Sequence, residues 1–223
     1  MPVTVLAAFL RMGKKYAVRQ LFEEAKRRLS LDSPPLLCAS KMSTAKKTIL
    51  FPRISGNDPF NFTVANIAGE VGLLSTVVMA IFYCCIACPA TSMANGYEFE
   101  GKGVILSPSN MRYCILAQDY LRDVERSMVQ ILGHLSKDCD RRLGYGRTTC
   151  VTAILTNLHR FQELKCPFSL WDPSWDEDLC VVCRAELRKR HDDARTRLWK
   201  KLPTALGLSP WEELDKDSEI LDS

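Results

Sequence analysis

One long uncharged segment restricts the fold of this chain more than any other feature. No charged residue occurs between Val71 and Tyr97, and the stretch VGLLSTVVMAIFYCCIACPA has 20 residues, about the length that crosses a bilayer. The features that oppose insertion are Gly72, Ser75, Thr76 and Pro89 within the segment and the acidic Glu70 and Glu98 beside it. Spanning helices are oriented by basic flanks, which are missing here. We therefore expect a helix buried in a protein core.

Helical periodicity covers most of the chain and predicts an all-α fold. The expected parts are a helical hairpin at residues 1–30, a connector at 31–59, a helical domain at 60–214 and a disordered acidic tail at 215–223. Because a hairpin cannot bury its apolar sides alone, these sides should be either exposed or folded back on residues 60–88. The residues concerned are Leu6, Phe9, Leu10, Leu21 and Phe22.

Within the helical domain, breaks in the pattern mark the expected elements. Gly72 separates two helices between residues 60 and 88, and residues 87–103 are predicted to form a loop. A long central helix should begin at the N-cap Ser107 and continue to about Leu135. The last helix is expected over Glu177–Leu202, with Trp211 packing back onto it after Pro203 ends it. These elements form an irregular helical bundle with almost no strand.

The composition is that of a folded protein, with 47% hydrophobic and 25% charged residues and a net charge of +4. Basic residues gather between Arg184 and Lys201, but Glu186, Asp192 and Asp193 are interleaved with them. This pattern favours a solvated helix over a phosphate-binding surface. The N-terminus lacks the basic region and cleavage site of a signal peptide, so we expect a cytoplasmic or nuclear protein whose ten cysteines are reduced.

Four cysteines form the strongest chemical pattern in the sequence. Cys180 and Cys183 are three residues apart on the expected last helix, and Cys139 and Cys150 flank an upstream turn. Four thiolates can bind zinc tetrahedrally, so these residues are the candidate metal ligands and zinc is the candidate metal. The alternatives are a redox pair or ordinary buried packing residues. The candidate substitute ligands are Cys166 and His191.

The remaining reactive residue types give no pattern of catalysis. Cys84, Cys85, Cys88 and Cys114 lie in the most apolar expected helices, where burial is the expectation. Serine elbows, GxxxxGK phosphate loops and dinucleotide fingerprints are all missing from the sequence. The tryptophans at positions 171, 175, 199 and 211 are expected to pack in the core of the C-terminal half. We therefore expect no enzymatic activity, catalytic residue or small-molecule substrate.

Four blocks of sequence resemble, in their order and spacing, the C-terminal part of the BTB/POZ-domain proteins of mushroom-forming fungi. The blocks are LAAFLRMGKKYAVRQLFEEAKRRL, VANIAGEVGLLSTVVMAIFYCC, LSPSNMRYCILAQDYL and LCVVCRAELRKRHDDARTRLWKKLPTALGLSPWEEL. The resemblance implies that residues 1–30 correspond to the helical end of a BTB domain whose mixed core is missing from this sequence. It also implies a non-enzymatic adaptor or scaffold that binds protein partners, which the sequence does not identify.

Two functions therefore remain as hypotheses. The first is a protein-interaction adaptor of BTB/POZ type. The alternative is a zinc-stabilised regulatory domain whose basic helix at residues 184–201 contacts nucleic acid. Binding to phosphates weakens steeply with added salt, whereas a contact between apolar grooves responds little, so salt dependence separates the two.

Overall fold

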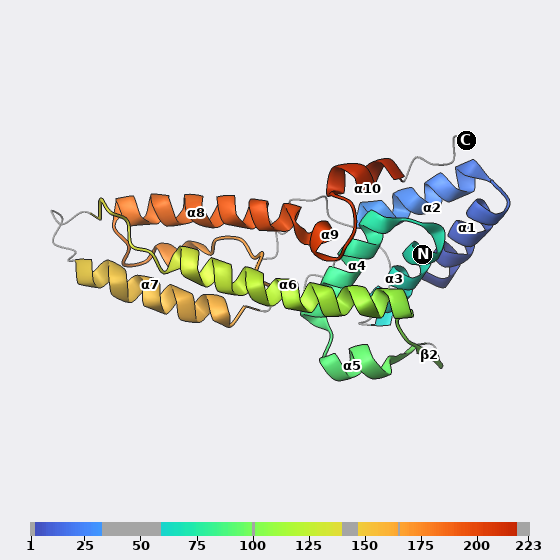
Figure 1. The fold of residues 1–223 in the computed structure, drawn as a ribbon, viewed down its shortest axis with the longest axis horizontal. Helices are drawn as coiled ribbons and strands as arrows, with labels where there is room; N and C mark the ends of the chain where they lie inside the picture. Colours follow the sequence, from blue (N-terminus) through green and yellow to red (C-terminus); the bar gives the residue numbers. More distant parts are fainter. Residues whose placement is uncertain (1–2, 33–58, 100, 140–146, 165, 218–223) are drawn as a thin grey trace. The chain divides into compact units, whose positions relative to one another are not determined.

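The computed structural model of the chain describes residues 3–32, 59–99, 101–139, 147–164 and 166–217 (Figure 1). Over these residues the fold is helical with one small two-stranded sheet, which confirms the predicted all-α class. Most of the predicted connector, residues 33–58, and the last residues of the predicted tail, 218–223, lie outside the described residues. The chain divides into two compact units: unit 1 is Met1–Leu36, Lys47–Asp119 and Lys201–Ser223, and unit 2 is Leu37–Lys46 and Tyr120–Lys200.

Unit 1 begins with the predicted helical hairpin, formed by α1 (Val3–Lys15) and α2 (Arg19–Asp32). The helices approach closely at Gly13, where an added Cβ atom would lie 2.8 Å from the backbone nitrogen of Phe22. Between the helices, Ala17 has a φ of 51°. Leu6, Leu10 and Phe22 are buried, and α1 packs on α3 (Pro59–Val71). The hairpin is therefore folded back at these positions.

The helix α4 (Leu74–Ala87) lies within the uncharged segment, and it packs against α3. All side chains from Thr76 to Cys84 are buried, which confirms the prediction of a core helix. Gly72 separates α3 from α4 with a φ of 83°, a conformation that side chains disfavour. Among the described residues, no helix combines the length and the apolar character needed to cross a membrane.

The prediction of a loop over residues 87–103 is wrong. The segment contains α5 (Ala90–Asn95) and two antiparallel strands, β1 (Tyr97–Phe99) and β2 (Lys102–Val104). Three-residue strands are too short to show the alternating pattern by which a strand is recognised in sequence. The ring of Tyr97 meets Phe62 of α3 edge-on, with 5.2 Å between centroids, so the two strands pack against α3 within unit 1.

The long helix α6 (Pro108–Leu132) begins at the predicted residue and ends slightly before Leu135. The hydroxyl of Ser107 accepts a hydrogen bond from the backbone nitrogen of Asn110 at 3.3 Å, as expected of an N-cap. Asn66 of α3 positions this start, because its side-chain oxygen accepts hydrogen bonds from the Ser107 backbone and the Asn110 side chain. The helices α9 (Leu202–Ala205) and α10 (Trp211–Asp217) pack on α4 and complete unit 1, with Trp211 buried there.

Unit 2 contains the rest of α6 together with α7 (Arg147–Gln162), a short 3₁₀ helix η2 (Pro173–Asp176) and α8 (Val181–Lys200). In Figure 1 the three long helices run side by side, and the hydroxyl of Tyr120 donates a 2.6 Å hydrogen bond to the carbonyl of Leu198. The last helix was expected over Glu177–Leu202, but it begins only at Val181. Asp178 has a φ of 60°, which an α-helix does not accommodate.

Candidate metal centre

Unit 2 brings together all four cysteines that the sequence predicts as metal ligands. The sulfur atoms of Cys139, Cys150, Cys180 and Cys183 all lie within 4.8 Å of one another. Cys139 follows α6, Cys150 lies in the first turn of α7, and the other two stand at the start of α8. Cys139 is partly buried and the other three are buried. Four sulfurs at this separation could hold one metal ion.

The start of α8 favours negative charge on two of the sulfurs. Cys180 directly precedes the first residue of α8, and Cys183 lies in its first turn. The sequence placed both cysteines on the helix, so the position of Cys180 is a correction. The unpaired N–H groups and the dipole of a helix N-terminus stabilise thiolates, which are the form of cysteine that binds metals.

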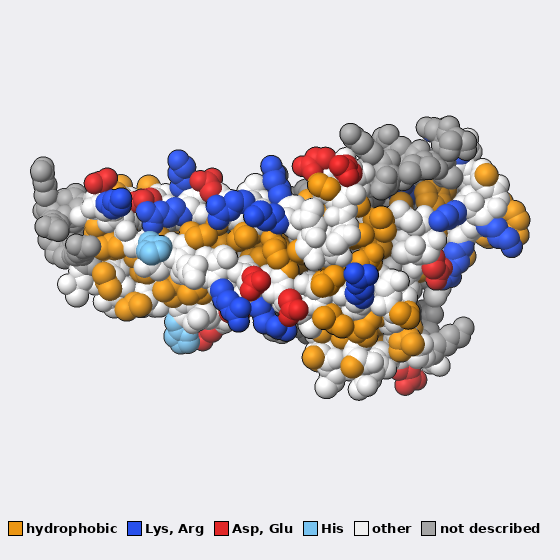
Figure 2. Space-filling view, in the orientation of Figure 1, with side chains coloured by type: hydrophobic (Ala, Val, Ile, Leu, Met, Phe, Trp, Pro, Cys, Tyr) orange, Lys and Arg blue, Asp and Glu red, His pale blue; other side chains and the backbone are white. Residues whose placement is uncertain are grey.

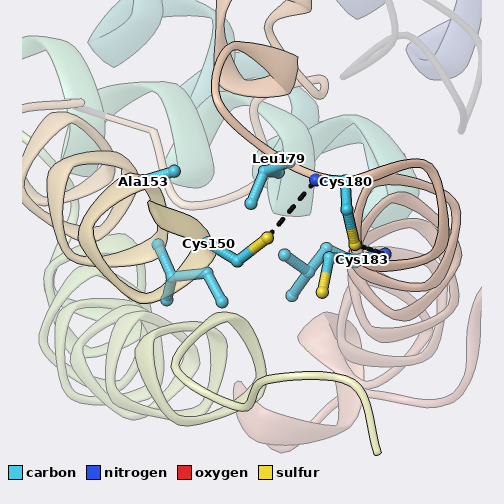
Figure 3. Packing of buried hydrophobic residues seen from close by; sticks show 7 residues of the cluster. Cys150, Ala153, Leu179, Cys180 and Cys183 are labelled. Carbon is cyan, nitrogen blue, oxygen red and sulfur yellow. Dashed lines mark hydrogen bonds between the residues drawn. The ribbon is translucent and has the colours of Figure 1, made fainter. Parts of the chain in front are cut away.

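Backbone N–H groups also point at the sulfurs. Cys180 donates from its nitrogen to the sulfur of Cys150 at 3.3 Å, and Cys183 donates to the sulfur of Cys180 at 3.4 Å (Figure 3). Burial raises the pKa of Cys183, and a hydrogen bond from the backbone of Ser136 offsets part of that rise. Hydrogen bonds of this kind orient ligands and favour their charged form, as the surroundings of a metal site do.

Burial acts in the opposite direction on the free thiols. It is the largest influence on Cys139 and Cys183, and it raises the pKa of both above the usual range. The two thiols therefore remain protonated at neutral pH unless a cation replaces the protons. Metal binding at such a site releases protons and depends on pH.

An apolar shell surrounds the sulfurs (Figure 3). It contains Ala153 and Ile154 of α7, Leu179 before α8 and Leu187 within it, with Trp171 packed at its edge. Within the part of the chain that the structure describes, this is the one group of cysteine, histidine or carboxylate side chains with metal-binding geometry. An all-sulfur donor set suits zinc and excludes magnesium and calcium, which take oxygen ligands.

The two predicted substitute ligands do not join the group. Cys166 is buried elsewhere in unit 2, where burial raises the pKa of its thiol to about 11. His191 is also fully buried, and its ring meets those of Trp171 and Trp175 edge-on at 5.7 and 6.0 Å between centroids. Neither residue has a sulfur or nitrogen within the four-cysteine group.

The surroundings of His191 were not foreseen from the sequence. Among the described residues, neither ring nitrogen of His191 makes a hydrogen bond, and the nearest carboxylate oxygen, on Asp192, is 3.6 Å from Nδ1. Arg195 lies one turn further along α8, is only 9% exposed and approaches the same carboxylate at 3.5 Å. Burial lowers the pKa of His191 to about 4, so its ring is neutral at physiological pH. The charged residues interleaved along α8 predict an exposed helix, and nothing in this pattern indicates that His191 is buried.

The second group of cysteines is a packing feature of unit 1. Cys84, Cys88 and Cys114 are buried, as predicted, and Cys85 is partly buried. The thiol of Cys85 donates to the carbonyl of Cys114, with 3.5 Å between sulfur and oxygen. Interaction with the Cys114 thiol, together with burial, raises the pKa of Cys84 and Cys85. Both therefore stay protonated, as packing residues do.

The basic residues of α8 are largely engaged with acidic neighbours. Arg188 and Arg184 both pair with Asp176, which also accepts a 3.0 Å hydrogen bond from the Trp171 indole. Arg190 pairs with Glu186. Figure 2 shows Lys and Arg side chains along α8 with acidic side chains among them. This arrangement is typical of a solvated helix, in which acidic side chains are interleaved with basic ones.

Comparison with known proteins adds no assignment. No protein-family model matches the chain, no characterised protein matches it, and no solved structure matches it.

Proposed function

We propose that the chain is a non-enzymatic protein-interaction adaptor of BTB/POZ type, located in the cytoplasm or nucleus, in which one zinc ion stabilises unit 2. The observation that carries the proposal is the convergence of four cysteine sulfurs to within 4.8 Å of one another. The sulfurs come from three segments of the chain, so one ion bound there would join the end of α6, the start of α7 and the start of α8.

The donor set argues for a structural role of the metal. Catalytic zinc sites keep a position open for water or substrate, whereas four cysteines fill the tetrahedron. Three of the four ligands are buried, and an apolar shell surrounds them. Zinc has no redox chemistry of its own, so its contribution here is to the folding of unit 2.

The adaptor role rests on different support. The order of the sequence blocks resembles BTB/POZ-type proteins, and among the described residues five of the ten exposed large apolar side chains lie between Val5 and Val18. The nucleic-acid alternative is less favoured because the acidic residues Asp176 and Glu186 pair with basic residues of α8. Protein partners, rather than nucleic acid or small molecules, are therefore proposed for these surfaces.

Titration of the metal-free chain with cobalt(II) tests the proposal. Cobalt replaces zinc in tetrahedral sites, and four thiolates give it characteristic absorption bands in the visible and near-ultraviolet. One equivalent should produce these bands, and zinc should displace cobalt and abolish them. A chain that gives only the spectrum of hydrated cobalt would refute the metal site.

A further inference from the structure

The outward face of α1 is apolar although the inward face already contributes to the core. Val5, Phe9 and Met12 of α1 and Tyr16, which directly follows the helix, are 38%, 36%, 50% and 62% exposed. Residues of an α-helix are about 100° apart, so these four lie within an arc of about 60° and form a ridge about 16 Å long. A helix that is apolar on both faces normally has both faces covered. We call these four residues the α1 ridge.

The α1 ridge is held facing outward by contacts on the other side of the helix. Arg11 makes two hydrogen bonds to the carboxylate of Glu70 at the end of α3, at 2.6 and 3.1 Å. Lys14 donates to the backbone carbonyl of the same residue at 3.1 Å. Together with the close contact of Gly13 and Phe22, these bonds prevent α1 from rotating to bury the ridge.

The spacing of the ridge fits a second helix. Its members are separated by four, three and four residues, which is the a/d spacing of a helix that packs into another helix. A membrane surface is a poorer fit, because helices that lie in the interface present a broad apolar face rather than a narrow seam. Helix-in-groove recognition uses anchors at this spacing.

The charge beside the α1 ridge indicates what kind of helix would bind to it. Residues 3–22 contain four basic side chains and no acidic one, and of these Arg11 is paired with Glu70 on the other side of the helix. Lys15 is exposed and lies 5.2 Å from the ring centroid of Tyr16, so a positive charge borders the ridge. A second copy of the chain would place like charges opposite one another, which disfavours pairing.

We infer that the α1 ridge binds an acidic amphipathic helix of a partner protein. The inference rests on the proposed adaptor role and names the class of partner. Apolar side chains of the partner would lie along Phe9 and Met12, and acidic side chains beside its seam would face Lys15. Charge at the rim of such a contact acts mainly on specificity and association rate.

The test measures binding of the full, zinc-loaded chain to two synthetic amphipathic helices of about three heptads. Both have leucine at positions a and d, and they carry either glutamate or lysine at e and g. The acidic peptide should bind at least about tenfold more tightly. A Phe9→Ser, Met12→Ser double variant should lose at least about tenfold, while Ile115→Ser, an exposed apolar position on α6, should bind as the wild type does.

A charge reversal makes the test specific. Lys15→Glu should weaken binding of the acidic peptide and strengthen binding of the basic one. Equal affinity for both peptides, no binding of the acidic peptide, or unchanged binding by the double variant would overturn the inference. The inference would also be overturned if the wild-type chain dimerised, or bound vesicles containing phosphatidylserine, and the double variant did not. A zinc-loaded chain that binds neither peptide contradicts only this inference, whereas a chain that takes up no zinc but binds the acidic peptide contradicts only the metal site.

Discussion

The backbone nitrogen of Cys180 lies 3.3 Å from the sulfur of Cys150 and donates a hydrogen bond to it. The two residues are 30 positions apart, so this bond joins the start of α8 to the start of α7. The bond fixes the position of the Cys150 sulfur, which the fold of unit 2 also places near three other cysteine sulfurs.

Removal of one candidate ligand should distinguish a metal site from a group of ordinary packing cysteines. Cys183→Ala is expected to abolish stoichiometric zinc binding and to lower the Tm of unit 2 strongly, because structural zinc contributes directly to folding. Cys166→Ala is the matched control, since Cys166 is a buried cysteine of the same unit outside the group. It should retain zinc and cost about 1 kcal/mol. Equal effects of the two substitutions, measured by thermal unfolding and elemental analysis, would favour packing.

Acid should destabilise unit 2 through His191. The pKa of this histidine is lowered by burial from 6.5 to about 4, while Asp192 raises it and Arg195 lowers it further. Above about pH 6.5 the ring is neutral in both the folded and unfolded states, so its contribution is constant. As the pH falls from 6.5 to about 4, only the unfolded state takes up the proton, and stability is lost. The difference in the pKa of His191 between the folded and unfolded states corresponds to a loss of about 3 kcal/mol in the free energy of unfolding.

The phenylalanine variant isolates this effect from acid release of the metal. His191→Phe keeps an aromatic ring beside Trp171 and Trp175 and removes the titrating group. Urea unfolding between pH 7 and pH 4 should show a shallower loss of stability in the variant than in the wild type, because both retain the four cysteines. Parallel curves would show that His191 does not carry the pH dependence.

The close packing of α1 against α2 depends on the absence of a side chain at Gly13. In Gly13→Ala, the new Cβ would lie 2.8 Å from the nitrogen and Cβ of Phe22, and backbone atoms there leave no room for adjustment. The free energy of unfolding should fall by about 1–3 kcal/mol. In Gly103→Ala the added atom meets nothing within 4 Å, so the change should stay within about 0.5 kcal/mol. A similar stability of both variants would contradict the close packing of α1 and α2.

A charge placed within α4 should unfold unit 1. Phe82 is 2% exposed, and Phe82→Asp would bury a carboxylate without a partner, at a cost of at least about 3 kcal/mol. Ile115→Asp is the control, because Ile115 is 56% exposed and a charge there remains solvated. Circular dichroism should show loss of helix in the first variant only. Recovery of the wild-type chain in the membrane fraction would instead overturn the assignment of α4 as a core helix.

Much of the fold follows from signals that are local in the sequence. The uncharged run, the glycine at position 72 and the Ser107 cap each act within a few residues, and α3, α4 and the start of α6 lie where these signals predict. The start of α8 was misplaced because Asp178 has a left-handed backbone, with a φ of 60°, and the sequence has no glycine there to mark it. The strands β1 and β2 were missed because each has only three residues.

The candidate metal site was predicted from residue type, although one CxxC pair is a weak signal. Spacing suggested that Cys180 and Cys183 share a turn, whereas the approach of Cys139 and Cys150 depends on how α6 and α7 pack. The buried position of His191 could not be inferred, because it stands among charged residues of α8 and the rings of Trp171 and Trp175 that pack against it come from an earlier segment of the chain. Phe9 was expected on the same apolar side as Leu6 and Leu10, but it is 36% exposed while the other two are buried.

The zinc content of the full chain tests the central claim most directly. Protein purified without chelator from zinc-supplemented medium should contain one equivalent of zinc per chain by elemental analysis and native mass spectrometry. The Cys166→Ala control should contain the same amount, and a chelator that removes the ion should expose Cys139, Cys150, Cys180 and Cys183 to a thiol reagent. Less than about a tenth of an equivalent of zinc, with these four thiols already free, would contradict the metal site and leave them as packing residues.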